Sequence, residues 1–171
     1  MDVLITEAPS TSPVIPIHVL NESQLADWLT SAPPHQSQWV KQHGFKGKAG
    51  QLVVLPGVDG QVAAALCGYD EKKDMIWTLA HLPARLPKGV YALSAETESR
   101  FSETQHALLY MGFGLACYRF DRYKKQTQPQ AQLLIPETLG EEFQVLLEAS
   151  FWARDIVNTP ANDMGPQELS D

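Results

Sequence analysis

The stretch QLVVLPGVDGQVAAALC, residues 51–67, consists of two apolar runs separated by Gly-Val-Asp-Gly. An Asp-Gly pair between apolar runs predicts a β-hairpin, because glycine readily adopts the positive φ that such a turn requires. Residues 51–56 and 61–67 are therefore predicted strands, joined through Asp59 and Gly60. The hairpin brings an antiparallel pair into whatever sheet it joins.

On both sides of the hairpin, apolar strands alternate with segments of helical periodicity. Further strands are predicted at 13–20, 90–93 and 131–135, and helices at 21–29, 36–42, 71–80, 102–118 and 138–158. Such alternation favours a layered α/β domain, so we expect a three-layer sandwich with a mixed β-sheet flanked by helices. Pro13 and Pro16 push the first of these strands toward a sheet edge or its own first residues. The residues before it, 1–13, are expected to form a loose arm or an edge strand.

Two helices begin with a capping-box pattern, in which Ser or Thr is followed three residues later by Gln or Glu; they start at Ser102 and Thr138. In the first helix, Gly112, Gly114 and Ala116 are small enough for close packing. In the second, residues at helical spacing predict the inner face: Leu139, Phe143, Leu146, Leu147, Ser150 and Val157. Carboxylates predict its solvated side: Glu137, Glu141, Glu142, Glu148 and Asp155.

Composition bounds the class of protein. The 171 residues fit one domain, or one domain plus a fragment of another, and the net charge of −7 argues against a nucleic acid as the main partner. Cys67 and Cys117 lie in apolar surroundings, which favours two buried thiols over a disulfide and fits a reducing compartment. The first residues lack the features of a signal peptide, and the longest apolar run is too short to cross a bilayer. We expect a soluble, cytoplasmic protein with no membrane partner.

The residues by themselves provide no catalytic or metal constellation. The histidines are His18, His35, His43, His81 and His106, none of them in H-x-x-x-H spacing, and the chain has neither C-x-x-C nor G-x-S-x-G. The stretch GFKGKAG, residues 44–50, lacks phosphate-loop spacing and precedes a strand, so it is interpreted as a flexible basic turn.

A basic, aromatic segment, YRFDRYKK, spans residues 118–125. Its composition is that of a nucleic-acid patch, carried by Arg119, Arg122, Lys124 and Lys125. Cations at the C-terminal end of a helix also complement the helix dipole. On an acidic chain the second interpretation is favoured, and salt-sensitive DNA binding would support the first.

Two segments resemble one known family. ARDIVNTPANDMGPQEL, residues 153–169, resembles the segment with which leucyl aminopeptidase family proteins leave their N-terminal domain and enter the peptidase domain. GFGLACYRFDRYK, residues 112–124, is similar to a helix-and-turn segment earlier in the same N-terminal domains. The two matches occur in the family's order and together cover about 30 residues.

The resemblance implies an N-terminal domain with a macro-domain-like α/β sandwich, truncated at the start of the catalytic domain. The parent would release N-terminal amino acids from peptides with two divalent cations, zinc or manganese. Family metal ligands surround an N-T-D-A-E-G-R signature that this chain lacks, so no catalytic or metal residue carries over and the chain alone should be inactive. The parent is expected to be a homohexamer and the fragment a monomer or weak dimer.

The same resemblance divides the chain into a domain at 1–136, a connector helix at 137–158, and a linker with the first turn of the peptidase domain at 159–171. Between them, Asn and Asp side chains can bond nearby backbone N–H groups and set a sharp turn. We interpret the turn as a structural hinge rather than a substrate contact. Its residues are Asn158, Thr159, Pro160, Asn162 and Asp163.

An alternative is a regulatory module that binds a nucleotide such as ADP-ribose, as macro domains do, or a nucleic acid. Against nucleotide binding, the sequence has no convincing glycine-rich phosphate cradle after a strand, and a fold does not determine function.

Overall fold

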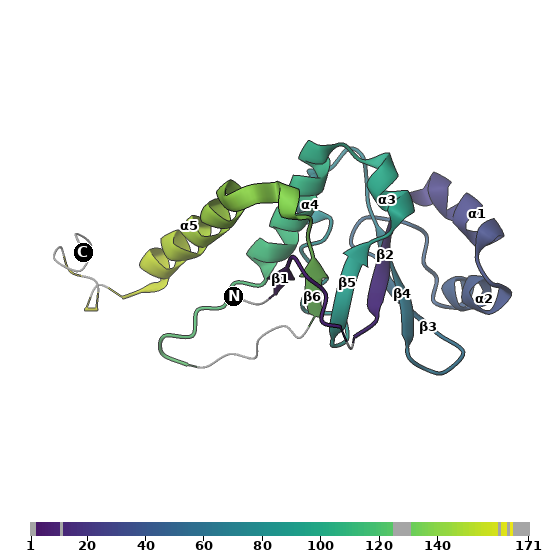
Figure 1. Cartoon of the computed structure of the whole chain (residues 1–171), viewed down its shortest axis with the longest axis horizontal. Helices are drawn as coiled ribbons and strands as arrows, with labels where there is room; N and C mark the ends of the chain where they lie inside the picture. The colour runs from purple at the N-terminus through teal and green to yellow at the C-terminus, as the bar shows by residue number, and fades with distance from the viewer. Residues whose placement is uncertain (1–2, 11, 125–130, 161, 164, 166–171) are drawn as a thin grey trace.

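The computed structural model describes residues 3–10, 12–124, 131–160, 162–163 and 165. Within this part of the chain, six strands form one sheet in the order β1-β6-β5-β2-β4-β3 (Figure 1). Neighbouring strands are parallel except β3 and β4, so the sheet is mixed, as predicted. The strands are β1 Leu4–Ile5, β2 Val14–Leu20, β3 Leu52–Pro56, β4 Val62–Gly68, β5 Gly89–Leu93 and β6 Ala131–Leu134.

The predicted hairpin is formed by β3 and β4. The N–H of Gly60 donates to the carbonyl of Gly57 at 3.1 Å, and the N–H of Gly57 donates to Gln61 at 2.7 Å. Gly60 has a φ of 80°, a conformation that a residue with a side chain rarely adopts. The Asp-Gly signal therefore predicted the turn for the correct physical reason.

Helices lie on both faces of the sheet and create two cores, which confirms the predicted sandwich. In β4, Ala65 and Cys67 point into the core that includes Leu109 of α4, whereas Leu66 points into the core that includes Trp28 of α1. Successive strand residues alternate between faces, so one strand serves both cores. The helices are α1 Glu22–Ser31, α2 Pro34–Gln42, α3 Ala95–Arg100, α4 Glu103–Ala116 and α5 Gly140–Asn158, with short 3₁₀ helices η1 Met75–Trp77 and η2 Glu137–Leu139.

The start of α4 and its close packing are confirmed. The Ser102 side chain accepts from the N–H of Gln105, whose side chain accepts from the N–H of Ser102, a complete capping box. Further along, a Cβ added to Gly112 would lie 1.6 Å from the carbonyl oxygen of Ile76. Only glycine lets α4 approach that backbone so closely.

The helix predicted at 71–80 is wrong. After β4 the chain turns at Asp70, whose carboxylate accepts from the N–H of Lys72 at 3.0 Å and whose carbonyl accepts from Lys73 at 3.0 Å. A side chain that bonds its own neighbouring backbone competes with helix formation. The only regular structure here is η1, whose Ile76 carbonyl lies against Gly112.

Of the two alternatives predicted from Pro13 and Pro16, the sheet edge is wrong, because β2 pairs with β4 on one side and β5 on the other, whereas the prolines do lie at the start of the strand. Pro16 is tolerated because pairing with β4 begins only at Ile17. The carbonyl of Ile17 accepts from the N–H of Ser94, on the β5 side. Backbone groups of successive residues point to opposite sides, so Pro16 points toward β4 before that ladder starts.

The last helix begins differently from the prediction. Thr138 lies in η2, and α5 follows from Gly140 without a side-chain cap, so the second capping box is wrong. The buried face consists of Phe143, Leu147 and Phe151. Leu146 and Val157, predicted to face inward, are instead 60% and 84% exposed. The sequence analysis also missed the short helix α3.

Cys67 and Cys117 are free and buried, as predicted, and burial raises the pKa of both thiols to about 12. The helices in the described ranges are all too short or too polar to cross a membrane.

Candidate functional site

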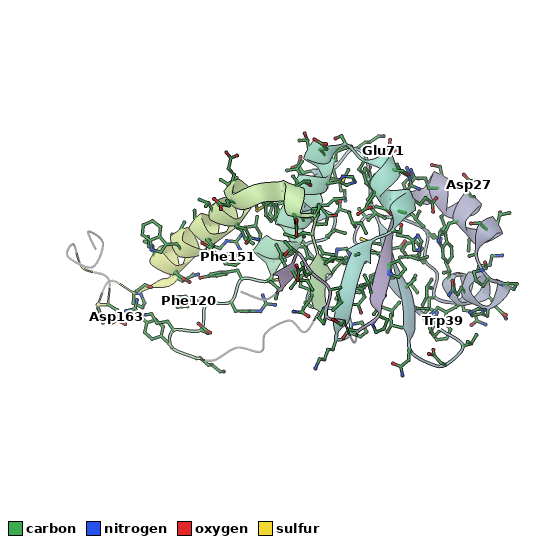
Figure 2. The ribbon with its side chains drawn as sticks, viewed as in Figure 1. Asp27, Trp39, Glu71, Phe120, Phe151 and Asp163 are labelled. Carbon is green, nitrogen blue, oxygen red and sulfur yellow. The ribbon has the colours of Figure 1, made fainter. Side chains whose placement is uncertain are left out.

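The two segments that carry the family resemblance meet in space. Residues 118–124, which follow α4, lie against the C-terminal half of α5 and the turn that follows it. Figure 2 shows Phe120, Phe151 and Asp163 at this end of the molecule, away from Trp39 and Asp27. We call this contact region, residues 118–124 with 151–160, 162 and 163, the junction.

Tyr118 is the centre of the junction. Its hydroxyl donates to Oδ1 of Asp155 at 2.7 Å and accepts from Nδ2 of Asn158 at 3.1 Å. Burial raises the pKa of Tyr118, and the hydrogen bond to the Asp155 carboxylate raises it further. The Tyr118 ring also packs 5.4 Å from the ring of Phe151. One side chain thus connects the end of α4 to three residues of α5.

Arg154 makes a second connection between the two helices. Its Nη1 donates to the carbonyl of Leu115 at 2.8 Å, and its guanidinium lies 5.4 Å from the centre of the Tyr118 ring. A carbonyl in the last turn of a helix lacks an intrahelical partner, so Arg154 satisfies a group that α4 leaves open.

Hydrogen bonds fix both ends of the turn predicted as a hinge, at Thr159 and at Asp163. Thr159 is buried, and its hydroxyl donates to the carbonyl of Asp155 at 2.7 Å and accepts from Nη1 of Arg122 at 3.5 Å. The N–H of Asp163 donates to Pro160 at 2.9 Å, and its carboxylate accepts from the hydroxyl of Tyr123.

Two side chains of the turn bond to residues that follow α4. Asn158 and Asp163 bond to Tyr118 and Tyr123, some 40 residues away in the chain. Pro160 and Asn162 are exposed.

Two of the four cations of the basic segment make hydrogen bonds within this region. Nη1 of Arg119 donates to the carbonyls of Ala116 at 2.9 Å and Tyr118 at 2.7 Å, at the C-terminal end of α4. Arg122 contacts Thr159, Lys124 is exposed, and Lys125 lies outside the described residues. This geometry fits cations that complement a helix terminus.

Sequence reasoning missed the roles of Tyr118, Tyr123 and Arg154. The interleaved aromatic and basic residues were a signal, but their partners on α5 and in the turn after it lie too far away in the chain to be identified by spacing. Asp155, expected on the solvated side of the last helix, accepts from Tyr118.

A small hollow of about 250 Å³ opens beside the junction. Trp152 and Ile156 of α5 form its apolar side, and Asp121, Arg122 and Asp155 supply charges. Such a site suits an inserted protein side chain better than a small substrate, whose pockets are usually larger and more enclosed.

Comparison with known proteins identifies the family. A family model described as the M17 aminopeptidase N-terminal domain matches residues 15–136. This chain belongs to the M17 aminopeptidase family, as an N-terminal domain. The predicted resemblance is therefore confirmed.

The M17 assignment agrees with individual relatives. A probable cytosol aminopeptidase of Leifsonia xyli is 26% identical over 145 residues, or 75% of this chain and 28% of its own length. The crystal structure of a cytosol aminopeptidase from Coxiella burnetii matches with a TM-score of 0.90 and 30% identity, over 99% of this chain and 36% of its own. This M17 domain therefore spans about a third or less of these two relatives.

More distant structures share the fold. The bottromycin maturation enzyme BotP in complex with Mn matches with a TM-score of 0.67 and 19% identity, over 94% of this chain and 35% of its own. A mutant of tomato leucine aminopeptidase matches with a TM-score of 0.60 and 17% identity, over 97% of this chain and 39% of its own.

A larger hollow of about 700 Å³ lies where β2 and β4 of this M17 domain end. Parallel α/β sheets often bind ligands at such a position. Here Lys48 lies 3.6 Å from Glu22, and Asp70 adds another negative charge. The N–H of Gln24 at the start of α1 is already bonded to Asn21. Three carboxylates and three lysines line the hollow, so it has no excess positive charge for a nucleotide's phosphates, and the nucleotide alternative gains no support.

The ionisable groups of the M17 domain do not form a metal site in the described ranges, where no three His, Cys, Asp or Glu side chains converge. His18, His81 and His106 each have a buried ring nitrogen without a partner, but they lie in β2, the loop after η1 and α4. Burial lowers the pKa of His18 and of His81.

Proposed function

We propose that this chain is the non-catalytic N-terminal domain of a metal-dependent aminopeptidase that releases N-terminal amino acids from peptides. One observation carries the proposal: 99% of the chain matches the Coxiella burnetii cytosol aminopeptidase at a TM-score of 0.90 but covers only 36% of that enzyme. The remaining part would hold the chemistry, and this domain would pack against it.

The division of the chain follows from the same reasoning. Residues 1–136 would form the domain body, 137–158 the connector and 159–171 the entry into the peptidase domain. The hinge would comprise Asn158, Thr159, Pro160, Asn162 and Asp163, held to the domain through Tyr118 and Tyr123. Residues 166–171, the expected first helical turn of the peptidase domain, lie outside the described residues.

The two divalent cations would bind in the peptidase domain, where they would activate water and polarise the scissile carbonyl. The residues described for this chain do not fit such a centre, since no suitable donors converge. The Mn complex of BotP supports manganese as one candidate, with zinc as the other. The name of the Leifsonia relative supports a cytosolic location.

The assembly would be built mainly by the peptidase domains, with a homohexameric parent and a monomeric or weakly dimeric fragment. The carboxylates of this acidic chain and the engaged guanidinium groups of Arg119 and Arg122 do not favour nucleic acid as a partner.

The test compares the chain with its full-length parent. With manganese or zinc added, the parent is expected to hydrolyse leucine p-nitroanilide, whereas the 171-residue chain is expected to release no nitroaniline. Sedimentation of the chain is expected to give a monomer or weak dimer. Hydrolysis by the chain alone, or a parent that is inactive with both cations, would contradict the proposal.

A further inference from the structure

Helix α5 has two apolar faces, and the domain covers only one of them. Phe143, Leu147 and Phe151 point into the core beside α4. On the other side four large apolar side chains are exposed: Val145 by 61%, Leu146 by 60%, Trp152 by 66% and Val157 by 84%. Isolated exposed apolar residues are common, but four on one helix form a continuous surface.

The exposed residues share one side of the helix. At about 100° per residue, Trp152, Val145, Leu146 and Val157 fall within an arc of roughly 140°, opposite the buried face. Ala149 and Ala153 lie within the same arc and are exposed. We call this arc, which these six residues form, the outer face of α5.

Charge borders the outer face along one edge only. Glu141 and Glu148, seven residues apart and exposed, lie just beyond Trp152 and Val145 around the helix. Glu142 lies within the arc, in the first turn. From Val145 to Val157 the outer face is therefore apolar, with an acidic row beside it.

We propose that the outer face of α5 is the docking surface for the peptidase domain of the same polypeptide, an inference that rests on the proposed function. The partner surface would be apolar at its centre. Cations along one edge would pair with Glu141 and Glu148, because charges at the rim of an interface are arranged to be complementary.

Two observations favour this occupant over a second copy of the chain. First, the Leifsonia and Coxiella aminopeptidases are much longer than this domain, and the match covers only 28% of the first and 36% of the second. Second, the outer face is continuous with the junction hollow, which Trp152 and Ile156 line. Figure 1 shows α5 extending beyond β1 and β6, at the opposite end of the molecule from α1 and α2. The surface therefore lies beside the segment that would lead into the peptidase domain.

The test measures how fast a maleimide reacts with a cysteine placed on the surface. Val145→Cys and Val157→Cys lie about 18 Å apart along the helix. Val58→Cys is the matched control, because Val58 is 95% exposed on the β3–β4 hairpin. Both native cysteines described here are buried. Each variant is made in the 171-residue chain and in the full-length parent, and labelling of each peptide is followed by mass spectrometry.

In the isolated chain we expect all three sites to react rapidly at every protein concentration. In the parent, labelling at positions 145 and 157 should slow by about tenfold or more, as expected for side chains inside a water-excluding interface. Labelling at position 58 should not change.

Three results would overturn the docking proposal. Slowing at position 157 alone would limit contact to the junction, and no slowing at either position would leave the outer face free. Slowing that appears in the isolated chain as its concentration rises would identify a second copy as the occupant. Hydrolysis of leucine p-nitroanilide by the same parent preparations separates the two proposals: an inactive parent that protects both sites would refute the function and retain the interface.

Discussion

Helices α4 and α5 pack side by side yet relate to the domain in different ways. The structure describes every residue of α4. Its Leu109, Tyr110 and Phe113 are buried, and among its large apolar side chains only Leu108 is exposed, at 38%. In α5 the buried residues occupy one side, and the outer face leaves Trp152 and other large apolar side chains in solvent.

The difference distinguishes apolar side chains that stabilise this domain, as in α4, from apolar side chains that remain available to a partner, as on the outer face of α5. The apolar surface of α4 is used almost entirely within the domain, where Gly112 and Gly114 let it approach η1 and Leu147 closely. The apolar surface of α5 is only half used. A surface helix normally has one apolar face, which it buries against the core, whereas α5 has a second apolar face that stays in solvent.

The largest effect is expected at the closest contact of α4. Gly112→Ala places a Cβ 1.6 Å from the backbone oxygen of Ile76, which cannot move without displacing η1. We expect it to lower the free energy of unfolding by about 3 kcal/mol or more, despite a helix-propensity gain of about 1 kcal/mol. Urea denaturation of the chain measures it.

Gly114→Ala is the matched control for that contact. Its Cβ would lie 2.9 Å from Cδ2 of Leu147, the end of a flexible side chain that can shift. A loss below about 1 kcal/mol is expected. Equal losses for the two variants would show that the approach of α4 to η1 is not the tight contact described.

The next effect compares adjacent residues of α5. Phe151→Ala removes a buried ring and should cost the isolated chain about 3 kcal/mol, whereas Trp152→Ala should change its stability by less than about 0.5 kcal/mol. In the parent, Trp152→Ala should also lower the melting temperature. If Trp152→Ala destabilises the isolated chain as much as Phe151→Ala, the outer face is already covered within the domain.

A smaller effect is expected where the two helices meet. Tyr118→Phe removes the hydroxyl that bonds Asp155 and Asn158 and should cost about 1 kcal/mol in urea denaturation. Tyr123→Phe removes the bond to Asp163, beyond the end of α5, and should leave the midpoint unchanged. A larger loss of stability for Tyr123→Phe than for Tyr118→Phe would show that the turn after α5, and not the Tyr118 contact, mainly holds α5 to the domain.

The smallest expected effect is a dependence of stability on pH that arises from histidines outside α5. Burial lowers the pKa of His81 from 6.5, the neighbouring Arg85 lowers it further, and a hydrogen bond with the Gln51 backbone opposes the shift. At pH values between the lowered pKa of the folded state and the ordinary pKa of the unfolded state, the unfolded chain binds more protons than the folded one. Stability therefore falls as pH drops below about 6.5. Burial acts on His18 in the same direction.

The measurement compares urea midpoints between pH 7.5 and pH 5. His81→Gln should flatten the decline, and combining it with His18→Gln should flatten it further. Because neither histidine lies on α5, labelling of Val157→Cys by maleimide should keep the same ratio to Val58→Cys across the range. An unchanged decline in the double variant would assign the pH dependence to other groups.

Local signals explain what could be predicted. The Asp59-Gly60 turn and the Ser102 cap depend on residues within a few positions of one another, so the sequence sufficed. The helix predicted at 71–80 failed because Asp70 forms a turn and Ile76 packs on Gly112, a contact between segments far apart in the chain.

By itself the sequence determined the alternation of strands and helices, the hairpin that makes the sheet mixed, and, through two short segments, the M17 family. Tertiary structure alone decided that Pro16 sits in a central strand, that Tyr118 meets Asp155, and which side of α5 stays in solvent. The physical reason is the range of the interactions. Turns and caps are closed by neighbouring residues, whereas burial and pairing depend on surfaces that only the folded chain brings together.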